Sequence, residues 1–137
     1  SRFCQSGEIK LFPLAQSMAE TLSVKYKLAI ASGSWAKDIR YILENASALN
    51  LFPVILGKES AAKEKPHPEI FINAAEKLGC APFECFVLED ALKGLHAAKE
   101  AGMPCIILRN ALNRNINFAG AELIFESLED FVSVLQD

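Results

Sequence analysis

The sequence predicts an α/β fold: a doubly wound, mainly parallel sheet with helices on both faces. Two observations indicate this class. The strand-like runs are apolar throughout, and helical patterns, not hairpin turns, separate them. A strand that is apolar at every position is buried on both sides, as in a parallel sheet between two layers of helices. In open sheets of this class, ligands bind outside the carboxyl ends of the strands.

Helical and strand-like segments alternate along the chain. Apolar residues at helical spacing predict a first helix over 11–22. The apolar run 27–31 predicts a strand, which ends in a tight turn at 32–34 before helical spacing resumes over 35–46. We expect further strands at 51–56, 85–88, 105–108 and, more weakly, 123–125, with helices at 68–78, 92–101 and 128–135.

Proline and glycine mark the ends of several of these segments. Pro53 favours the start of a strand or a strand at the sheet edge, because proline donates no backbone hydrogen bond. Pro68 suits the first position of a helix. Gly79 and Gly102 suit the positions where helices stop.

Composition excludes several classes of protein. The chain has 137 residues, of which 51% are hydrophobic and 23% charged, so we expect one globular domain over 1–137. The net charge of -3, with dispersed Lys and Arg, argues against a nucleic-acid partner. No apolar run approaches the ~20 residues that span a bilayer, which argues against a membrane partner. Four cysteines without a Cys-x-x-Cys pair predict reduced core thiols and a cytoplasmic setting.

A serine turn follows the 27–31 strand. The backbone N–H groups and hydroxyls of Ser32-Gly33-Ser34 lie between a strand and a helix, where they could face an anion. Ser34 could instead cap the helix that begins at Trp35, a common role for serine. Both interpretations stay open for this turn alone.

Lys65 lies in a segment rich in proline, Lys65-Pro66-His67-Pro68. The prolines limit the freedom of the backbone, so the ammonium group could be held over a phosphate. For Lys65 taken alone, however, an ordinary lysine beside the solvated charges of Lys63 and Glu64 is the favoured interpretation. For His67 we expect an exposed loop position or a role at the start of the next helix.

Glu89 and Asp90 directly follow a buried strand. Two adjacent carboxylates repel each other unless solvent, a cation or a capping contact stabilises them. Hard oxygen ligands of this kind suit Mg²⁺. Asp90 could alternatively cap the helix that follows, and for the pair alone both interpretations remain equal.

The order of these motifs resembles the haloacid dehalogenase superfamily of phosphatases and phosphomutases, especially its β-phosphoglucomutase-like branch. The resemblance covers roughly residues 7–110, and implies a Rossmann-like sheet. It rests on Leu28-Ala-Ile-Ala-Ser-Gly-Ser34, on Lys65-Pro-His-Pro-Glu-Ile-Phe71, and on Val87-Leu-Glu-Asp-Ala-Leu-Lys-Gly94 with Ala97-Ala-Lys-Glu-Ala-Gly-Met103.

The resemblance implies a role for each candidate site residue. Ser32 would hydrogen-bond the transferring phosphoryl group of a small phosphorylated metabolite, and Gly33 and Ser34 would extend this phosphate cradle. Lys65 would balance the charge of the phosphoryl group and of the nucleophile, while Glu89 and Asp90 would hold Mg²⁺. Such electrostatic positioning is most of what phosphoryl transfer requires.

The family's nucleophile is not in this sequence. In the family, an Asp-x-Asp motif at the end of the first strand forms an aspartyl-phosphate, but no Asp-x-Asp occurs here. The family's cap domain is also absent. We therefore expect residues 1–137 to be the carboxyl-terminal part of the core domain of a phosphatase or sugar-phosphate mutase, inactive on its own. The alternatives are a noncatalytic regulatory or partner-binding derivative and, less favoured because it needs no metal, a haloacid dehalogenase.

The resemblance also predicts an incomplete sheet, with its first strand missing. In the family, that strand lies between the strands that end here near Ala31 and Leu88. Its loss would leave two unpaired edges in the middle of the sheet. We therefore expect these edges to pair with a second chain or with an amino-terminal segment outside this sequence.

Overall fold

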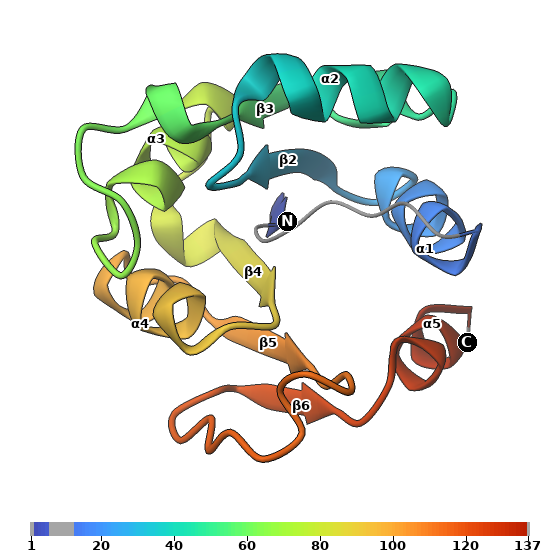
Figure 1. Ribbon diagram of the computed structural model, residues 1–137, viewed down its shortest axis with the longest axis vertical. Helices are drawn as coiled ribbons and strands as arrows, with labels where there is room; N and C mark the ends of the chain where they lie inside the picture. The colour runs from blue at the N-terminus through green and yellow to red at the C-terminus, as the bar shows by residue number, and fades with distance from the viewer. Residues whose placement is uncertain (1, 6–12, 137) are drawn as a thin grey trace.

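A six-stranded sheet with the strand order β3-β2-β1-β4-β5-β6 forms the centre of the computed structural model, which describes residues 2–5 and 13–136 (Figure 1). Every neighbouring pair of strands is parallel, which confirms the expected fold class. The strands are β1 (Arg2–Gln5), β2 (Lys27–Ala31), β3 (Val54–Leu56), β4 (Cys85–Glu89), β5 (Cys105–Leu108) and β6 (Leu123–Phe125).

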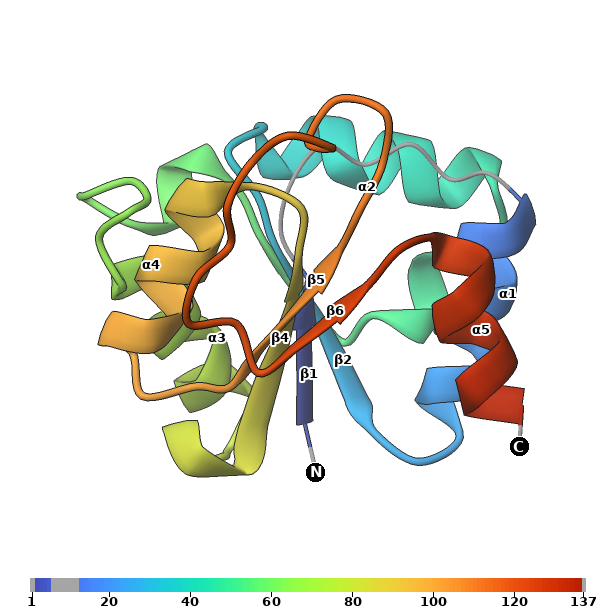
Figure 2. The same ribbon diagram turned by 90° about the horizontal axis from the view of Figure 1, so that it is seen from below.

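Helices cover both faces of the sheet. Figure 2 shows α3 and α4 on one side and α1, α2 and α5 on the other. Their bounds are α1 (Pro13–Ser23), α2 (Ala36–Asn45), α3 (Glu69–Leu78), α4 (Leu92–Glu100) and α5 (Leu128–Gln136). The part of the first expected helix that precedes Pro13 lies outside the described residues. None of the described helices is long and apolar enough to cross a membrane.

Strand β2 shows why the strands are apolar along most of their length: it is buried on both faces of the sheet. Leu28 and Ile30 pack in the cluster formed with α1, α2 and α5. Ala29 and Ala31 pack in the cluster formed with α3 and α4. Successive side chains of a strand point to opposite faces, so a sheet covered on both sides needs apolar residues throughout.

Glycine and proline act at the element ends much as expected. Gly79 follows α3 with φ of 74°, and Gly102 follows α4 with φ of 76°, a conformation that residues with a Cβ rarely adopt. Strand β3 is one of the two edge strands, as Pro53 predicts, but it is shorter than the expected 51–56 run. A turn of 3₁₀ helix at Leu49–Leu51 and the missing N–H of Pro53 delay its start.

The prediction of a missing strand in the middle of the sheet is wrong. Strand β1 lies between β2 and β4 and pairs with both, so that Cys4 is opposite Ala29 on one side and Val87 on the other. Unpaired backbone groups at two central edges need hydrogen-bond partners, and even a short extended segment supplies them. The chain's own residues therefore fill the place for which we expected a second chain or an external segment.

The packing of α2 against the sheet predicts how shortening either of two neighbouring side chains of this helix affects the free energy of unfolding. Leu43 is fully buried, whereas Ile42 is 37% exposed. Leu43→Ala should lower the free energy of unfolding by about 2–5 kcal/mol, because it removes packed atoms and leaves a cavity. Ile42→Ala should cost less than about 1 kcal/mol. Urea denaturation of the two variants measures the difference, and equal losses would contradict this placement of α2.

Candidate active site

The predicted polar residues meet at the carboxyl edge of the sheet. Ser32 directly follows β2 and Asp90 directly follows β4, and only β1 separates these two parallel strands. A pocket of about 570 Å³ opens at this edge. All six candidate site residues line it: Ser32, Gly33, Ser34, Lys65, Glu89 and Asp90.

The serine turn is shaped by Ser32. Its backbone N–H donates to the carbonyl of Leu56 at 3.0 Å, and its Oγ accepts from the N–H of Ser34 at 3.1 Å. Ser32 is 1% exposed, whereas Gly33 is exposed and has open space where a Cβ would lie. The alternative in which Ser34 caps the next helix is wrong, because Trp35, not Ser34, is the residue that directly precedes α2.

Residues 57–59, directly after β3, hold this turn in place, and they were not among the candidate site residues predicted from the sequence. The N–H of Lys58 donates to the Ser34 carbonyl at 2.7 Å, and Glu59 Oε1 accepts from the N–H of Ala36 at 3.1 Å. A Cβ on Gly57 would overlap the backbone of Ser34 and Ala36. Only glycine therefore allows this approach. The signal that could have found the segment is its place directly after a strand.

Lys65 is held inside the pocket, not in solvent. Its Nζ donates to the Ala31 carbonyl at 3.0 Å and forms an ion pair with Glu89 Oε2 at 3.4 Å. The ammonium group also lies 4.9 Å from the centre of the Phe71 ring. Burial lowers the pKa of Lys65 to about 7, with a further lowering by the charge of Lys93 and an opposing contribution from Asp90.

The Glu89 carboxylate is almost completely buried, and it is tied on both sides. Oε2 pairs with Lys65, while Oε1 accepts from the N–H groups of Asp90 at 3.2 Å and Ala91 at 3.3 Å. Gly94 makes room for the carboxylate, because a Cβ there would overlap it. Asp90 does not cap α4, since Ala91 precedes that helix without a side-chain cap.

Asp90 is half-buried and lines the pocket. Its Oδ2 accepts from Asn110 Nδ2 at 3.4 Å. Within residues 2–5 and 13–136, no three His, Cys, Asp or Glu side chains form a group that could hold a metal. Mg²⁺ is usually bound through one or two carboxylates and keeps water and phosphate as its other ligands, and the half-buried Asp90 carboxylate in the pocket lining is a ligand of this kind.

Lysines dominate the charge of the pocket wall. Lys58, Lys63 and Lys93 line it together with Lys65, and none of these three was a candidate from sequence. Three acidic residues, Glu64, Glu89 and Asp90, also line the pocket. This balance of charges favours a small anion beside a cation held by the carboxylates.

His67 and the described cysteines lie away from the pocket lining. His67 Nδ1 accepts from the N–H of Glu69 at 3.2 Å, which agrees with the expected role at the start of α3. Cys85 and Cys105 are buried, as expected for core cysteines, and Cys80 is half-buried. Burial raises the pKa of Cys105 to about 12, so this thiol stays protonated.

Comparison with known protein families identifies the family of this chain. A family described as haloacid dehalogenase-like hydrolase matches residues 2–108. This chain belongs to that family. Protein CbbY of Cereibacter sphaeroides is 33% identical over 128 residues, which are 90% of this chain and 56% of CbbY.

Solved structures agree with this assignment. CbbY from Rhodobacter sphaeroides, in complex with phosphate, is 32% identical with a TM-score of 0.78, over 91% of this chain and 57% of that one. A putative β-phosphoglucomutase from Thermotoga maritima is 26% identical with a TM-score of 0.77, over 90% and 58%. The resemblance to the β-phosphoglucomutase-like branch is thus confirmed. The chain spans little more than half the length of these relatives.

Lys65→Met should change how stability depends on pH. The folded-state pKa of Lys65 is about 7, whereas the unfolded chain keeps the ordinary value of 10.5. Between these values the unfolded state binds more protons, so the free energy of unfolding of the unaltered chain rises with pH. Lys65→Met lacks this contribution, and its stability relative to the unaltered chain should fall as pH increases from about 7 to 10.

Chemical denaturation at a series of pH values measures this difference. Lys77→Met, at an exposed position of α3, is the matched control and should follow the pH dependence of the unaltered chain. Parallel curves for Lys65→Met and the unaltered chain would contradict the lowered pKa of Lys65.

Proposed function

We propose that this chain is the part of the core domain of a Mg²⁺-dependent phosphatase or sugar-phosphate mutase that binds the phosphoryl group. Its substrate would be a small phosphorylated metabolite, and the relative from Rhodobacter sphaeroides was crystallised with phosphate. The observation that carries the proposal is the single pocket lined by a serine turn, a buried lysine and two adjacent carboxylates.

The serine turn and Lys65 would bind the phosphoryl oxygens. The Ser32 hydroxyl and the Gly33 N–H would supply donors at the start of the connection to α2. Ser34 would complete this cradle through its N–H, which donates to Ser32 Oγ at 3.1 Å and holds that hydroxyl in place. Donors fixed in a site that excludes water stabilise charge more strongly than donors in solvent. Lys65 adds a positive charge, and a bound dianion would raise its pKa from about 7 and keep the ammonium group protonated.

Asp90 and Glu89 would hold the metal. Magnesium, when bound, neutralises charge that develops on the phosphoryl oxygens. Asp90 lines the pocket as a half-buried carboxylate, and Glu89 links this site to Lys65 through their ion pair. The carboxylate pair favours this function over a haloacid dehalogenase, which needs no metal.

The nucleophile would come from outside this sequence. In the family an aspartate at the end of the first strand attacks the phosphoryl group and forms an aspartyl-phosphate. Strand β1 occupies the place between β2 and β4, with Gln5 opposite Ile30 and Leu88, but no Asp-x-Asp follows it. We infer that this chain binds phosphate and metal and needs an added aspartate for turnover.

A second candidate function is a noncatalytic module that senses or binds a phosphorylated partner. The lack of an Asp-x-Asp in these 137 residues favours it. The two candidates share the pocket, and they differ in whether the protein that contains this chain forms an aspartyl-phosphate.

Inorganic phosphate in the presence of Mg²⁺ should bind at the serine turn. In ¹H–¹⁵N NMR titrations, the amide signals of Ser32, Gly33 and Asp90 should shift. Lys65→Met should weaken phosphate binding by at least about tenfold, because a hydrogen bond to a charged group contributes roughly 1.5–3 kcal/mol. Lys77→Met is the control and should bind as the unaltered chain does. Shifts spread over the surface, unaffected by Lys65→Met, would overturn the proposed site.

Turnover separates the two candidate functions. The 137-residue chain with Mg²⁺ and p-nitrophenyl phosphate should show no hydrolysis, since it contains no Asp-x-Asp. A longer protein whose Asp-x-Asp strand replaces β1 between β2 and β4 should hydrolyse the ester and lose that activity in Asp90→Ala. Saturable hydrolysis by the 137-residue chain, lost in Asp90→Ala, would contradict the external nucleophile. An inactive longer protein that still binds phosphate would favour the noncatalytic module.

A further inference from the structure

Asn113 is an unusual polar residue in this fold. Among the described residues with a polar or charged side chain, those that are buried are Ser32, Glu89 and Asn113. Ser32 and Glu89 line the pocket, whereas Asn113 lies in the loop that follows β5. Asn113 is not among the candidate site residues that the sequence predicts, and it lies outside the motifs that resemble the family.

The side chain of Asn113 joins this loop to the residue that follows β4. Its Nδ2 donates to the carbonyl of Asp90 at 2.9 Å and to the carbonyl of Leu108 at 3.0 Å. Its Oδ1 accepts from the N–H of Asn110 at 2.8 Å. One buried amide therefore fixes the backbone of Asp90 relative to β5.

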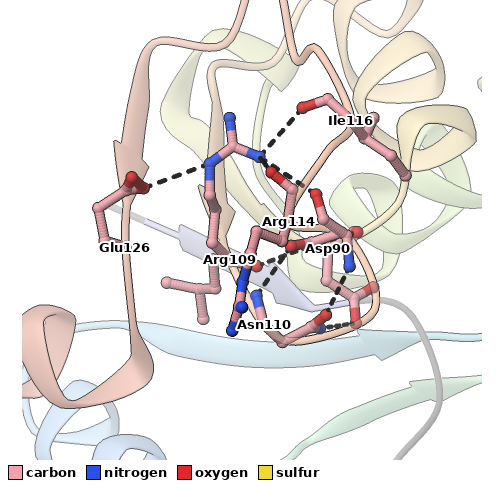
Figure 3. Close-up of polar contacts among 8 residues, drawn as sticks. Asp90, Arg109, Asn110, Arg114, Ile116 and Glu126 are labelled. Carbon is pink, nitrogen blue, oxygen red and sulfur yellow. Dashed lines mark hydrogen bonds and ion pairs between the residues drawn. The ribbon is translucent and has the colours of Figure 1, made fainter.

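Asn110 continues the connection to the Asp90 carboxylate. Its Nδ2 donates to Asp90 Oδ2 at 3.4 Å, as the sticks in Figure 3 show. Its Oδ1 accepts from the N–H groups of Leu112 at 2.8 Å and Asn113 at 3.0 Å. The same side chain thus shapes the loop and contacts the carboxylate.

Arg109 holds the loop in this conformation. Its guanidinium group donates to the carbonyls of Asn113 at 3.2 Å, Arg114 at 3.4 Å and Ile116 at 3.0 Å (Figure 3). It also forms an ion pair with Glu126 at 3.2 Å and lies against the Phe118 ring. Arg109 thus ties three backbone carbonyls of the loop that carries Asn110 and Asn113 to the end of β5.

We propose that Asn110 and Asn113 are positioning residues for the magnesium site. Asn113 fixes the backbone of Asp90, and Asn110 orients its carboxylate by engaging Oδ2. The donor is a neutral amide, so it orients the carboxylate and leaves its negative charge for a cation. A lysine or arginine in the same place would compete with the metal. The inference rests on the proposed function, because it assigns these residues to the metal site of that proposal.

Mn²⁺, used in place of Mg²⁺, gives a readout that does not depend on turnover. Paramagnetic broadening of ¹H–¹⁵N signals in the 137-residue chain should be centred on Asp90, and its concentration dependence gives Kd. Asn110→Ser keeps a side-chain oxygen for the loop N–H groups and removes the donor to Asp90. We expect this variant to raise Kd by about tenfold, as is typical when an outer partner of a metal ligand is lost.

Matched variants separate positioning from a merely structural role. Asn115→Ser, at an exposed site of the same loop, should leave Kd unchanged. In Asn110→Ser the amide signals of Arg114 and Ile116, whose carbonyls Arg109 binds, should stay in place while Kd rises, which a loop that only maintains the fold would not produce. Asn113→Ala should raise Kd and shift the Asp90 amide; if Asn113→Ala fails to fold, Asn110→Ser decides the outcome.

Two results would overturn the inference, and they can be told apart. An unchanged Kd in Asn110→Ser, with broadening at Asp90 that disappears in Asp90→Asn, would overturn the positioning role and leave the metal site intact. No broadening centred on Asp90 in the unaltered chain would overturn the metal site of the proposed function, and the positioning role with it.

Discussion

The buried ammonium group of Lys65 joins the segments on which the pocket depends. It donates to the carbonyl that ends β2 and pairs with the carboxylate that ends β4, while the Phe71 ring of α3 lies beneath it. A buried charge is costly unless it is paired, so Lys65 keeps this place only if both strands end at the same edge. Strand β1 ensures this by pairing in register with each of them.

The fold class and the central site residues could be predicted from the sequence, because both depend on patterns among residues close together in the chain. Because both faces of the sheet are covered, β2 is apolar from Leu28 to Ala31 and β4 from Cys85 to Leu88, and a polar residue follows each run. Ser32 and Glu89 are buried polar side chains directly at those ends. Lys65 was weaker as a prediction, since its burial depends on α3 and on two strands distant in sequence.

Contacts between distant backbone segments leave no such signal. Strand β1 has four residues, two of them polar, and its pairing depends on edges made by β2 and β4. Asn113 reaches the carbonyl of Asp90, and Glu59 reaches the N–H of Ala36, across more than twenty positions of sequence. The sequence also presents Glu89 and Asp90 as one pair, whereas the fold turns Glu89 to Lys65 and Asp90 to Asn110.

Because Glu89 pairs with Lys65 and Asp90 contacts Asn110, binding of the proposed metal ion and binding of the proposed phosphoryl group would depend on each other. Without ligands, Glu89 and Lys65 neutralise each other in a site with little solvent. A cation bound at Asp90 and Glu89 would compete for the carboxylate and leave the Lys65 ammonium group with less negative charge around it. A phosphoryl dianion beside Ser32 would supply that charge. In the proposed function, each ligand would therefore lower the electrostatic cost of binding the other, and by linkage the metal would strengthen phosphate binding by the same factor as phosphate strengthens metal binding.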